Sequence, residues 1–105
     1  MSSIEIQAIN LVDEKIIVLF NHYWVQEDVN TLSKLILNPI ANITIKETII
    51  GADIENIRFH WLESEFILSF ECYSQSCWLE LQNPQNPSNT HAFFDVLIAN
   101  SKCYV

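Results

Sequence analysis

The chain has 105 residues, half of them hydrophobic, and its 13 acidic and five basic side chains give a formal net charge of −8. This length predicts a single domain spanning residues 1–105, and the charge argues against nucleic acid or an anionic membrane as a partner, since both need clustered Lys and Arg. The N-terminus does not resemble a signal peptide, no apolar stretch reaches the ~20 residues of a membrane span, and three cysteines suit a reducing compartment, so a cytoplasmic location is expected.

The N-terminal part of the sequence predicts two strands followed by a helix. Residues 4–8 alternate apolar and polar side chains, as a half-buried strand does. The apolar run that starts at residue 16 and continues to 25 predicts a second strand, paired with the first and covered on both faces. Helical spacing predicts a helix over 26–37, which ends before Pro39. The apolar stripe of this helix consists of Val29, Leu32, Leu35 and Ile36.

The C-terminal part predicts four more strands and a second helix. A strand over 42–50 ends at Gly51, the only glycine, which indicates a positive φ angle or a bulge. A helix over 90–100, capped by Ser88 or Asn89, follows a loop rich in Pro and Asn. The other strands are residues 56–62, 66–73 and 77–81, and the apolar face of the helix is Phe93, Phe94, Leu97 and Ile98. The order ββαββββα predicts an α+β fold, an antiparallel sheet with two helices packed on one face.

The last three strands are expected to share one apolar face. Turns at 63–64 and 74–75 would pair Trp61 with Phe66 and Cys72 with Cys77. That face would hold Ile57, Phe59, Trp61, Phe66, Leu68, Phe70, Cys72, Cys77, Leu79 and Leu81.

On this interpretation Cys72 and Cys77 are small buried hydrophobes. Two alternatives stay open. A disulfide between them would be strained and easily reduced, which suits a redox switch. A metal site would need further ligands, and the sequence does not bring the candidates together. Those candidates are His22, His60, His91 and Cys103.

The opposite face of the same strands is the candidate binding surface. The predicted register places Arg58, Ser69 and Glu80 in one row, and the simplest interpretation is a solvated face with an Arg58–Glu80 ion pair. Large apolar side chains beside the only arginine are also typical of interface centres. The candidate partner-binding residues are Arg58, His60, Leu62, Ile67, Tyr73 and Trp78. No glycine-rich loop, nucleophile motif or zinc motif occurs, so no catalytic residue, metal ligand or cofactor is predicted.

A family resemblance rests on a short glycine-containing turn and on polar and aromatic residues around the last hairpin. These are Gly51-Ala52-Asp53, then Glu71, Tyr73-Ser74, Ser76 and Trp78. In these positions the segment 51–81 resembles a family of small bacterial proteins of unknown function. The resemblance implies a bacterial cytosolic protein and implies no activity.

The sequence therefore favours a small acidic bacterial domain that is not an enzyme and acts through protein–protein interaction or regulation. Its partner would be another protein, for which a basic patch would match the acidic charge, or a second copy in a homodimer; nucleic acid and membranes are not expected. The alternative is a thiol-based redox switch or a metal-binding protein that uses Cys72 and Cys77. A third hypothesis is an enzyme whose site is assembled from residues distant in the sequence.

Overall fold

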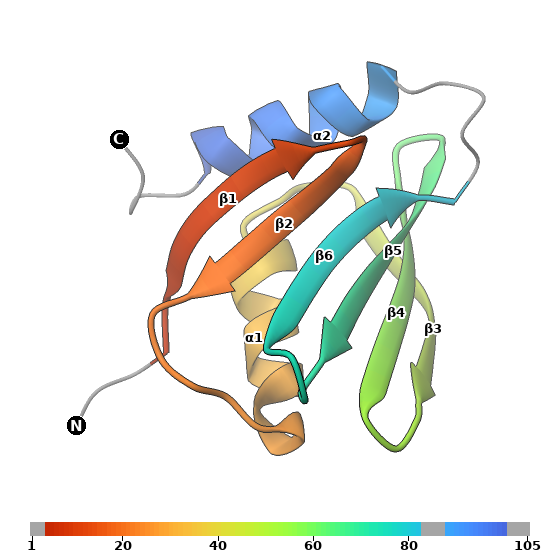
Figure 1. The fold of residues 1–105 in the computed structure, drawn as a ribbon. Helices are drawn as coiled ribbons and strands as arrows, with labels where there is room; N and C mark the ends of the chain where they lie inside the picture. Colours follow the sequence, from red (N-terminus) through yellow and green to blue (C-terminus); the bar gives the residue numbers. More distant parts are fainter. Residues whose placement is uncertain (1–3, 83–87, 101–105) are drawn as a thin grey trace.

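The computed structural model describes residues 4–82 and 88–100, and in it a six-stranded antiparallel sheet carries two helices on one face (Figure 1). The predicted α+β class and the order ββαββββα are confirmed. The elements are β1 (Ile6–Val12), β2 (Lys15–Phe20), the 3-10 turn η1 (Gln26–Asp28), α1 (Val29–Leu37), β3 (Ile43–Ile50), β4 (Ile54–Trp61), β5 (Ser64–Glu71), β6 (Ser76–Leu81) and α2 (Ser88–Ala99). No helix among the described residues is long and apolar enough to cross a membrane.

The strand order is β1-β2-β6-β5-β4-β3, so β1 and β3 are the edges. The hairpin β1–β2 joins the meander β3–β6 through pairing of β2 with β6, and the connection through α1 carries the chain from β2 to the far edge. The expectation that the second strand is covered on both faces is wrong, because the helices cover one face only. Ile16 and Val18 point to the core, whereas Leu19 is exposed, and β2 ends at Phe20.

The buried faces of the two helices differ in part from the predicted ones. In α1 the predicted Leu35 is exposed, and Ser33 and Leu37 are buried in its place. The predicted start at Gln26 is a 3-10 turn, and the helix stops before Pro39 as expected. The second helix begins at Ser88, so the predicted caps Ser88 and Asn89 lie in its first turn instead. Of its predicted apolar face, Phe93 and Leu97 are fully buried, and Phe94 and Ile98 are partly buried.

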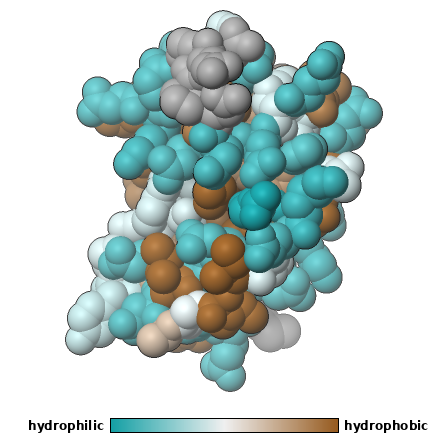
Figure 2. All heavy atoms as spheres, turned by 90° about the vertical axis from the view of Figure 1, so that its right-hand side faces the viewer, coloured by the Kyte–Doolittle hydropathy of each residue, from teal (hydrophilic) through white to brown (hydrophobic). Residues whose placement is uncertain are grey.

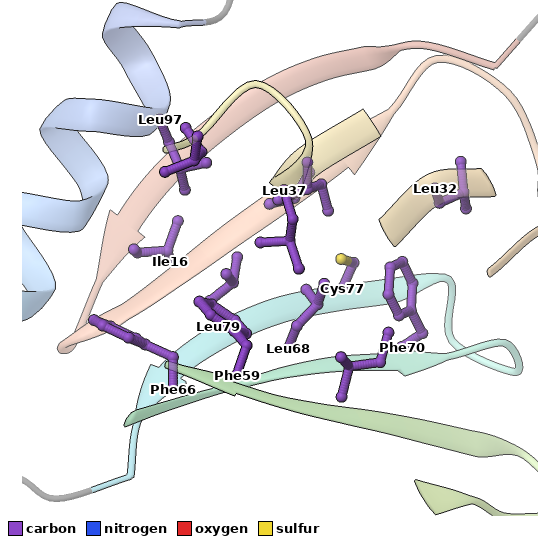
Figure 3. Packing of buried hydrophobic residues seen from close by; sticks show 14 of the residues in the cluster. Ile16, Leu32, Leu37, Phe59, Phe66, Leu68, Phe70, Cys77, Leu79 and Leu97 are labelled. Atoms are coloured by element: carbon purple, nitrogen blue, oxygen red, sulfur yellow. The ribbon is translucent and has the colours of Figure 1, made fainter. Parts of the chain in front are cut away.

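The core lies between the sheet and the helices (Figure 3). Aromatic rings dominate it: the Phe66 and Phe93 ring centroids are 4.9 Å apart, and Trp24, in the loop after β2, lies edge-on to Phe70 at 5.7 Å. The predicted apolar face of the meander is confirmed, since eight of its ten members are buried and the other two, Cys72 and Leu81, are partly buried against the core.

The register within that face differs from the prediction by two residues in each hairpin. Phe59, not Trp61, lies opposite Phe66, and Phe70, not Cys72, lies opposite Cys77. The β4–β5 turn is Leu62–Glu63, and the β5–β6 turn is the four residues 72–75. A slip of two residues leaves each side chain on its face, which explains why the core prediction survives.

The turns use left-handed residues that are not glycine. Positive φ angles occur at Asp13, Glu14, Asn42, Leu62 and Gln75. The expected positive φ at Gly51 is wrong. A Cβ atom at Gly51 would lie 3.0 Å from the Ile54 carbonyl oxygen, the atom that accepts the Gly51 N–H, so close approach of the backbone explains this glycine.

Candidate functional site

The outer face of the sheet, which points away from both helices, carries two rows of residues that cross all six strands. From β1 to β3, the first row is Asn10, Ile17, Trp78, Ser69, Asn56 and Ile49. The second row is Val12, Lys15, Glu80, Ile67, Arg58 and Glu47. The predicted row of Arg58, Ser69 and Glu80 is therefore wrong, because the β4–β5 turn begins one residue earlier than predicted and places Ile67 opposite Arg58, and Ile67 also lies opposite Glu80.

Arg58 is the centre of an ionic network at the β3 side of the outer face. Its guanidinium contacts the Glu47 carboxylate, and its Nε donates to Glu65 Oε2 at 3.0 Å. His60 Nε2 lies 3.0 Å from Glu65 Oε1. The predicted Arg58–Glu80 pair is not formed. The network links β3, β4 and β5 through their side chains.

Glu65 is ionised at neutral pH within this network. The hydrogen bond from His60 is the largest cause of a lowered Glu65 pKa; partial burial opposes it, and Arg58 lowers the pKa further. All four side chains are partly exposed, at 27–49%. Such a network contributes modestly to stability, but it fixes the position of charges on the surface.

The centre of the outer face is apolar and aromatic. Ile67 and Trp78 are half-buried, and the indole N–H of Trp78 donates to Glu80 Oε2 at 2.9 Å. Ser69, directly opposite Trp78, is only 2% exposed and donates to Asn56 Oδ1 at 2.8 Å. Side chains here are thus packed closely enough to exclude water from a serine, while Ile67 and Trp78 keep accessible surface.

A hollow opens at the end of the outer face where β2 and β6 separate. Their pairing stops after three residue pairs, at Ile17 and Trp78. A space of about 400 Å³ lies at this point, and its lining is Lys15, Ile17, Leu19, Ser74, Gln75, Ser76, Cys77 and Trp78. The hollow therefore extends the apolar centre of the outer face toward the β5–β6 turn.

A single side chain bridges the strands beyond this point. The Gln75 amide accepts the Trp24 N–H at 3.0 Å and donates to the Trp24 carbonyl at 2.7 Å and to the Cys72 carbonyl at 2.9 Å. The amide pairs with Trp24 as a neighbouring strand would, so it replaces backbone pairing that β2 and β6 do not make.

Four of the six predicted partner-binding residues lie on the outer face: Arg58, His60, Ile67 and Trp78. The other two lie in turns at opposite ends of the meander. Leu62 is in the β4–β5 turn and Tyr73 in the β5–β6 turn, and both are exposed. The prediction missed Glu47, Glu65 and Ile17. Ile17 could have been found from the alternation of 16–20, whereas Glu47 and Glu65 depend on the strand order and register.

The cysteines are not opposite each other. Cys77 is 1% exposed in the core, where burial raises the pKa of its thiol, and its cross-strand partner is Phe70 (Figure 3). Cys72 lies in the turn, with its Sγ 3.8 Å from the Trp24 carbonyl oxygen. Both are free thiols. The predicted pairing is therefore wrong, and Cys103 lies outside the described residues.

The histidines are dispersed over the described part of the chain. His22 is exposed in the loop after β2, and His91 on α2 lies 3.8 Å from Glu14 at the surface. Residues 4–82 and 88–100 contain no group of three or more His, Cys, Asp or Glu side chains that could hold a metal. Within the same ranges, no hydroxyl or thiol forms a hydrogen bond with a histidine.

Comparison with known proteins gives a family but no activity. The model of the family described as "Protein of unknown function (DUF3630)" matches residues 5–99. No curated protein and no solved structure matches the chain. The match extends the resemblance seen at 51–81 to nearly the full sequence.

Proposed function

This chain belongs to that family of unknown function, and we propose that it is a protein-binding domain without catalytic activity whose outer face is the binding surface. The observation that carries the proposal is the centre of this face. Ile17, Ile67 and Trp78 form an apolar patch with a hollow at one end, beside charged side chains held by hydrogen bonds. Apolar and aromatic centres with polar rims are typical of protein interfaces.

The charges of the outer face favour a partner with basic residues. Four acids (Glu47, Glu65, Glu71 and Glu80) accompany Lys15 and Arg58, so the strands β2–β6 contribute a net charge of −4 + 2 = −2 to this face. The chain as a whole carries −8. Complementary potentials accelerate association and exclude wrong partners, and the effect weakens as salt rises.

Thiol chemistry is a weaker candidate, because the two cysteines lie in different environments. The Cys77 thiol is buried and its pKa is raised, which opposes formation of the reactive thiolate. Of the two cysteines in residues 4–82 and 88–100, only Cys72 is within reach of solvent. The redox hypothesis therefore rests on the sequence alone.

Affinity capture with matched variants tests the proposal. The immobilised full-length chain would be exposed to a lysate of its source organism at low and at moderate salt, and bound proteins would be quantified by mass spectrometry. We expect a specific partner whose recovery falls as salt rises. The double variant Ile67→Ala/Trp78→Ala should reduce its recovery at least about tenfold, since interface anchors of this kind often contribute more than 1 kcal/mol each.

The control is Tyr23→Ala, which removes an exposed aromatic ring from the loop after β2. It should leave recovery of the partner unchanged, and urea unfolding would verify that each variant is folded. Equal recovery by the wild type and the double variant would contradict the assignment of the outer face. A wild-type chain that enriches no protein over bare resin would contradict the proposed function itself.

A further inference from the structure

The edge strand β3 is exposed along nearly its whole length. Seven of its eight residues are exposed, among them Ile45, Ile49 and Ile50 at 46–69%. The side of the molecule on which β3 lies shows a hydrophobic area in its lower half (Figure 2). An edge strand also presents backbone N–H and C=O groups that a further strand can pair with. Exposed aliphatic residues on such an edge mark an interaction site.

We propose that β3 pairs antiparallel with β3 of a second copy of this chain, about a two-fold axis between Lys46 and Glu47. Read backwards, the sequence of β3, ITIKETII, keeps isoleucine at both ends, exchanges isoleucine with threonine at the positions next to them, and has the opposite charge at each of the two central positions. In this register Lys46 of each copy faces Glu47 of the other, and Ile43 faces Ile50. Opposite charges and aliphatic pairs across neighbouring strands are both stabilising. A two-fold interface requires such self-complementarity.

The β-bulge in β3 makes this register consistent with the two faces of the sheet. In a regular strand, residues an odd number of positions apart point to opposite faces, so Ile43 and Ile50 could not be opposed in one sheet. Here Ile45 is paired with Phe59 and Glu47 with Arg58, so that Lys46 is an extra residue and the alternation shifts by one.

After the shift, the three matched pairs on either side of the central Lys46–Glu47 pair each share a face. Ile43 and Ile50 pair with Trp61 and Glu55, which both lie on the helix side of β4. Thr44 and Ile49 likewise pair with outer-face residues, and Ile45 and Thr48 with helix-side residues. A lysine and a bulge often protect an edge from pairing. In β3 the same two features instead make the strand complementary to itself.

The charges at the centre are available for this contact. Lys46 is exposed and forms no ion pair with another described residue. The Glu47 side chain contacts Arg58 and is still 49% exposed. Pairing would join two six-stranded sheets into one of twelve strands, with both outer faces on the same side. A dimer would therefore present two copies of the outer face to a partner, although the pairing itself does not depend on the proposed function.

Sedimentation equilibrium of the full chain and its charge variants tests the pairing. We expect a concentration-dependent dimer. Lys46→Glu should weaken it by about tenfold or more, because two opposite-charge pairs become two like-charge pairs. Glu47→Lys should weaken it similarly. An equimolar mixture of the two variants should restore a dimer, since each acidic copy then faces a basic one. The control Lys15→Glu changes the net charge equally on β2 and should have no effect.

Three outcomes would overturn the proposal. The wild type could remain monomeric up to about 1 mM, which would mean that two copies do not pair with a dissociation constant below that concentration. The Lys46→Glu variant could dimerise as tightly as the wild type, in which case another surface is responsible. A mixture of folded Lys46→Glu and Glu47→Lys chains that stays monomeric would rule out the register. Circular dichroism of each variant separates a lost dimer from a lost fold.

Discussion

Replacing Gln75 with alanine tests whether one side chain closes the gap left where β2 and β6 separate. The change removes all three hydrogen bonds of the Gln75 amide, two of them to the backbone of Trp24. Trp24 is 2% exposed and packs against Phe20 and Phe70, so its backbone groups lie close to the core. We expect the loop after β2 to lose its attachment to the β5–β6 turn, and the free energy of unfolding to fall.

The magnitude follows from the number of bonds and from the backbone of Gln75. Three hydrogen bonds of about 1 kcal/mol each give an upper figure of about 3 kcal/mol, and water that reaches the half-buried site lowers it to about 2 kcal/mol. Gln75 also has a φ of 58°, a conformation that costs a residue with a side chain roughly 1–2 kcal/mol and costs glycine little. Gln75→Gly should therefore lose only about 1 kcal/mol.

Urea unfolding followed by tryptophan fluorescence measures both variants. With a slope of roughly 1–2 kcal/mol per molar urea, Gln75→Ala should lower the midpoint by about 1–2 M, and Gln75→Gly by about half as much. A decrease of less than about 0.3 M for alanine would mean that water replaces the amide fully. Equal midpoints for alanine and glycine would refute the argument from the positive φ angle.

Further predictions concern a turn, a buried thiol and a carboxylate. Glu14→Gly should raise the free energy of unfolding by about 1 kcal/mol, because Asp13 and Glu14 both have a positive φ angle and Asp-Gly is favoured in such a turn. Glu14→Ala should give no gain in the same urea titration. Cys77→Ser should lower the free energy of unfolding by roughly 1–3 kcal/mol, because it buries a hydroxyl group in the core. In the native protein, mass spectrometry should find that a thiol reagent modifies Cys72 and leaves Cys77 unlabelled. The pKa of Glu65 is lowered on folding, so ionised Glu65 stabilises the folded state above the ordinary glutamate pKa of about 4.3. This stabilisation is lost as the pH falls through the lowered pKa. The free energies of unfolding of the wild type and Glu65→Gln should therefore converge in acid.

Each of these three predictions has an outcome that contradicts it. Equal gains from glycine and alanine at position 14 would show that loss of the Glu14 side chain, and not the positive φ angle, is responsible for the gain. Labelling of native Cys77 at the rate of Cys72 would mean that the core opens readily around it. A stability difference between wild type and Glu65→Gln that stays constant from neutral pH to pH ~3 would remove the assigned role of the His60 hydrogen bond.

The alternation of apolar residues predicted which side of β4, β5 and β6 is buried, but it could not predict which residues lie opposite each other. Faces repeat every two residues, so a register shifted by two gives the same core. The turns determine the register, but their sequences lack the residues that normally mark the turn positions. Leu62 adopts a positive φ that glycine or asparagine would normally supply, and Gln75 does the same in the next turn. The predicted site therefore kept Ile67 and Trp78 on one face and misplaced Leu62 and Tyr73.

The ionic network around Arg58 depends on the strand order and on a β-bulge, and neither follows from the alternation of residues within one strand. Glu47 reaches Arg58 only because β3 lies beside β4 and because the bulge at Lys46 turns Glu47 to the outer face. The sequence ITIKETII nevertheless indicates a bulge, because its apolar residues do not keep one parity along the strand. Ile43 and Ile45 share one parity with the charged Glu47, whereas Ile50 has the other parity, so a regular strand would place a carboxylate beside two isoleucines on the helix side.

A shift of one residue at Lys46 resolves this conflict, and it has two consequences. It gives Arg58 its carboxylate partner on the outer face. It also allows two copies of β3 to pair antiparallel with residues of the same sheet face opposite each other, which a regular strand of this sequence could not do in the proposed register. A variant that lacks Lys46 should separate the two features. Without the extra residue, Ile45 and Glu47 become neighbours in a regular strand, so Glu47 stays opposite Arg58 and the ionic network is kept. The proposed pairing loses both Lys46–Glu47 contacts and brings the Glu47 carboxylates of the two copies together, so the dimer should weaken while the titration of Glu65 is unchanged. A dimer as tight as that of the wild type would contradict the proposed register.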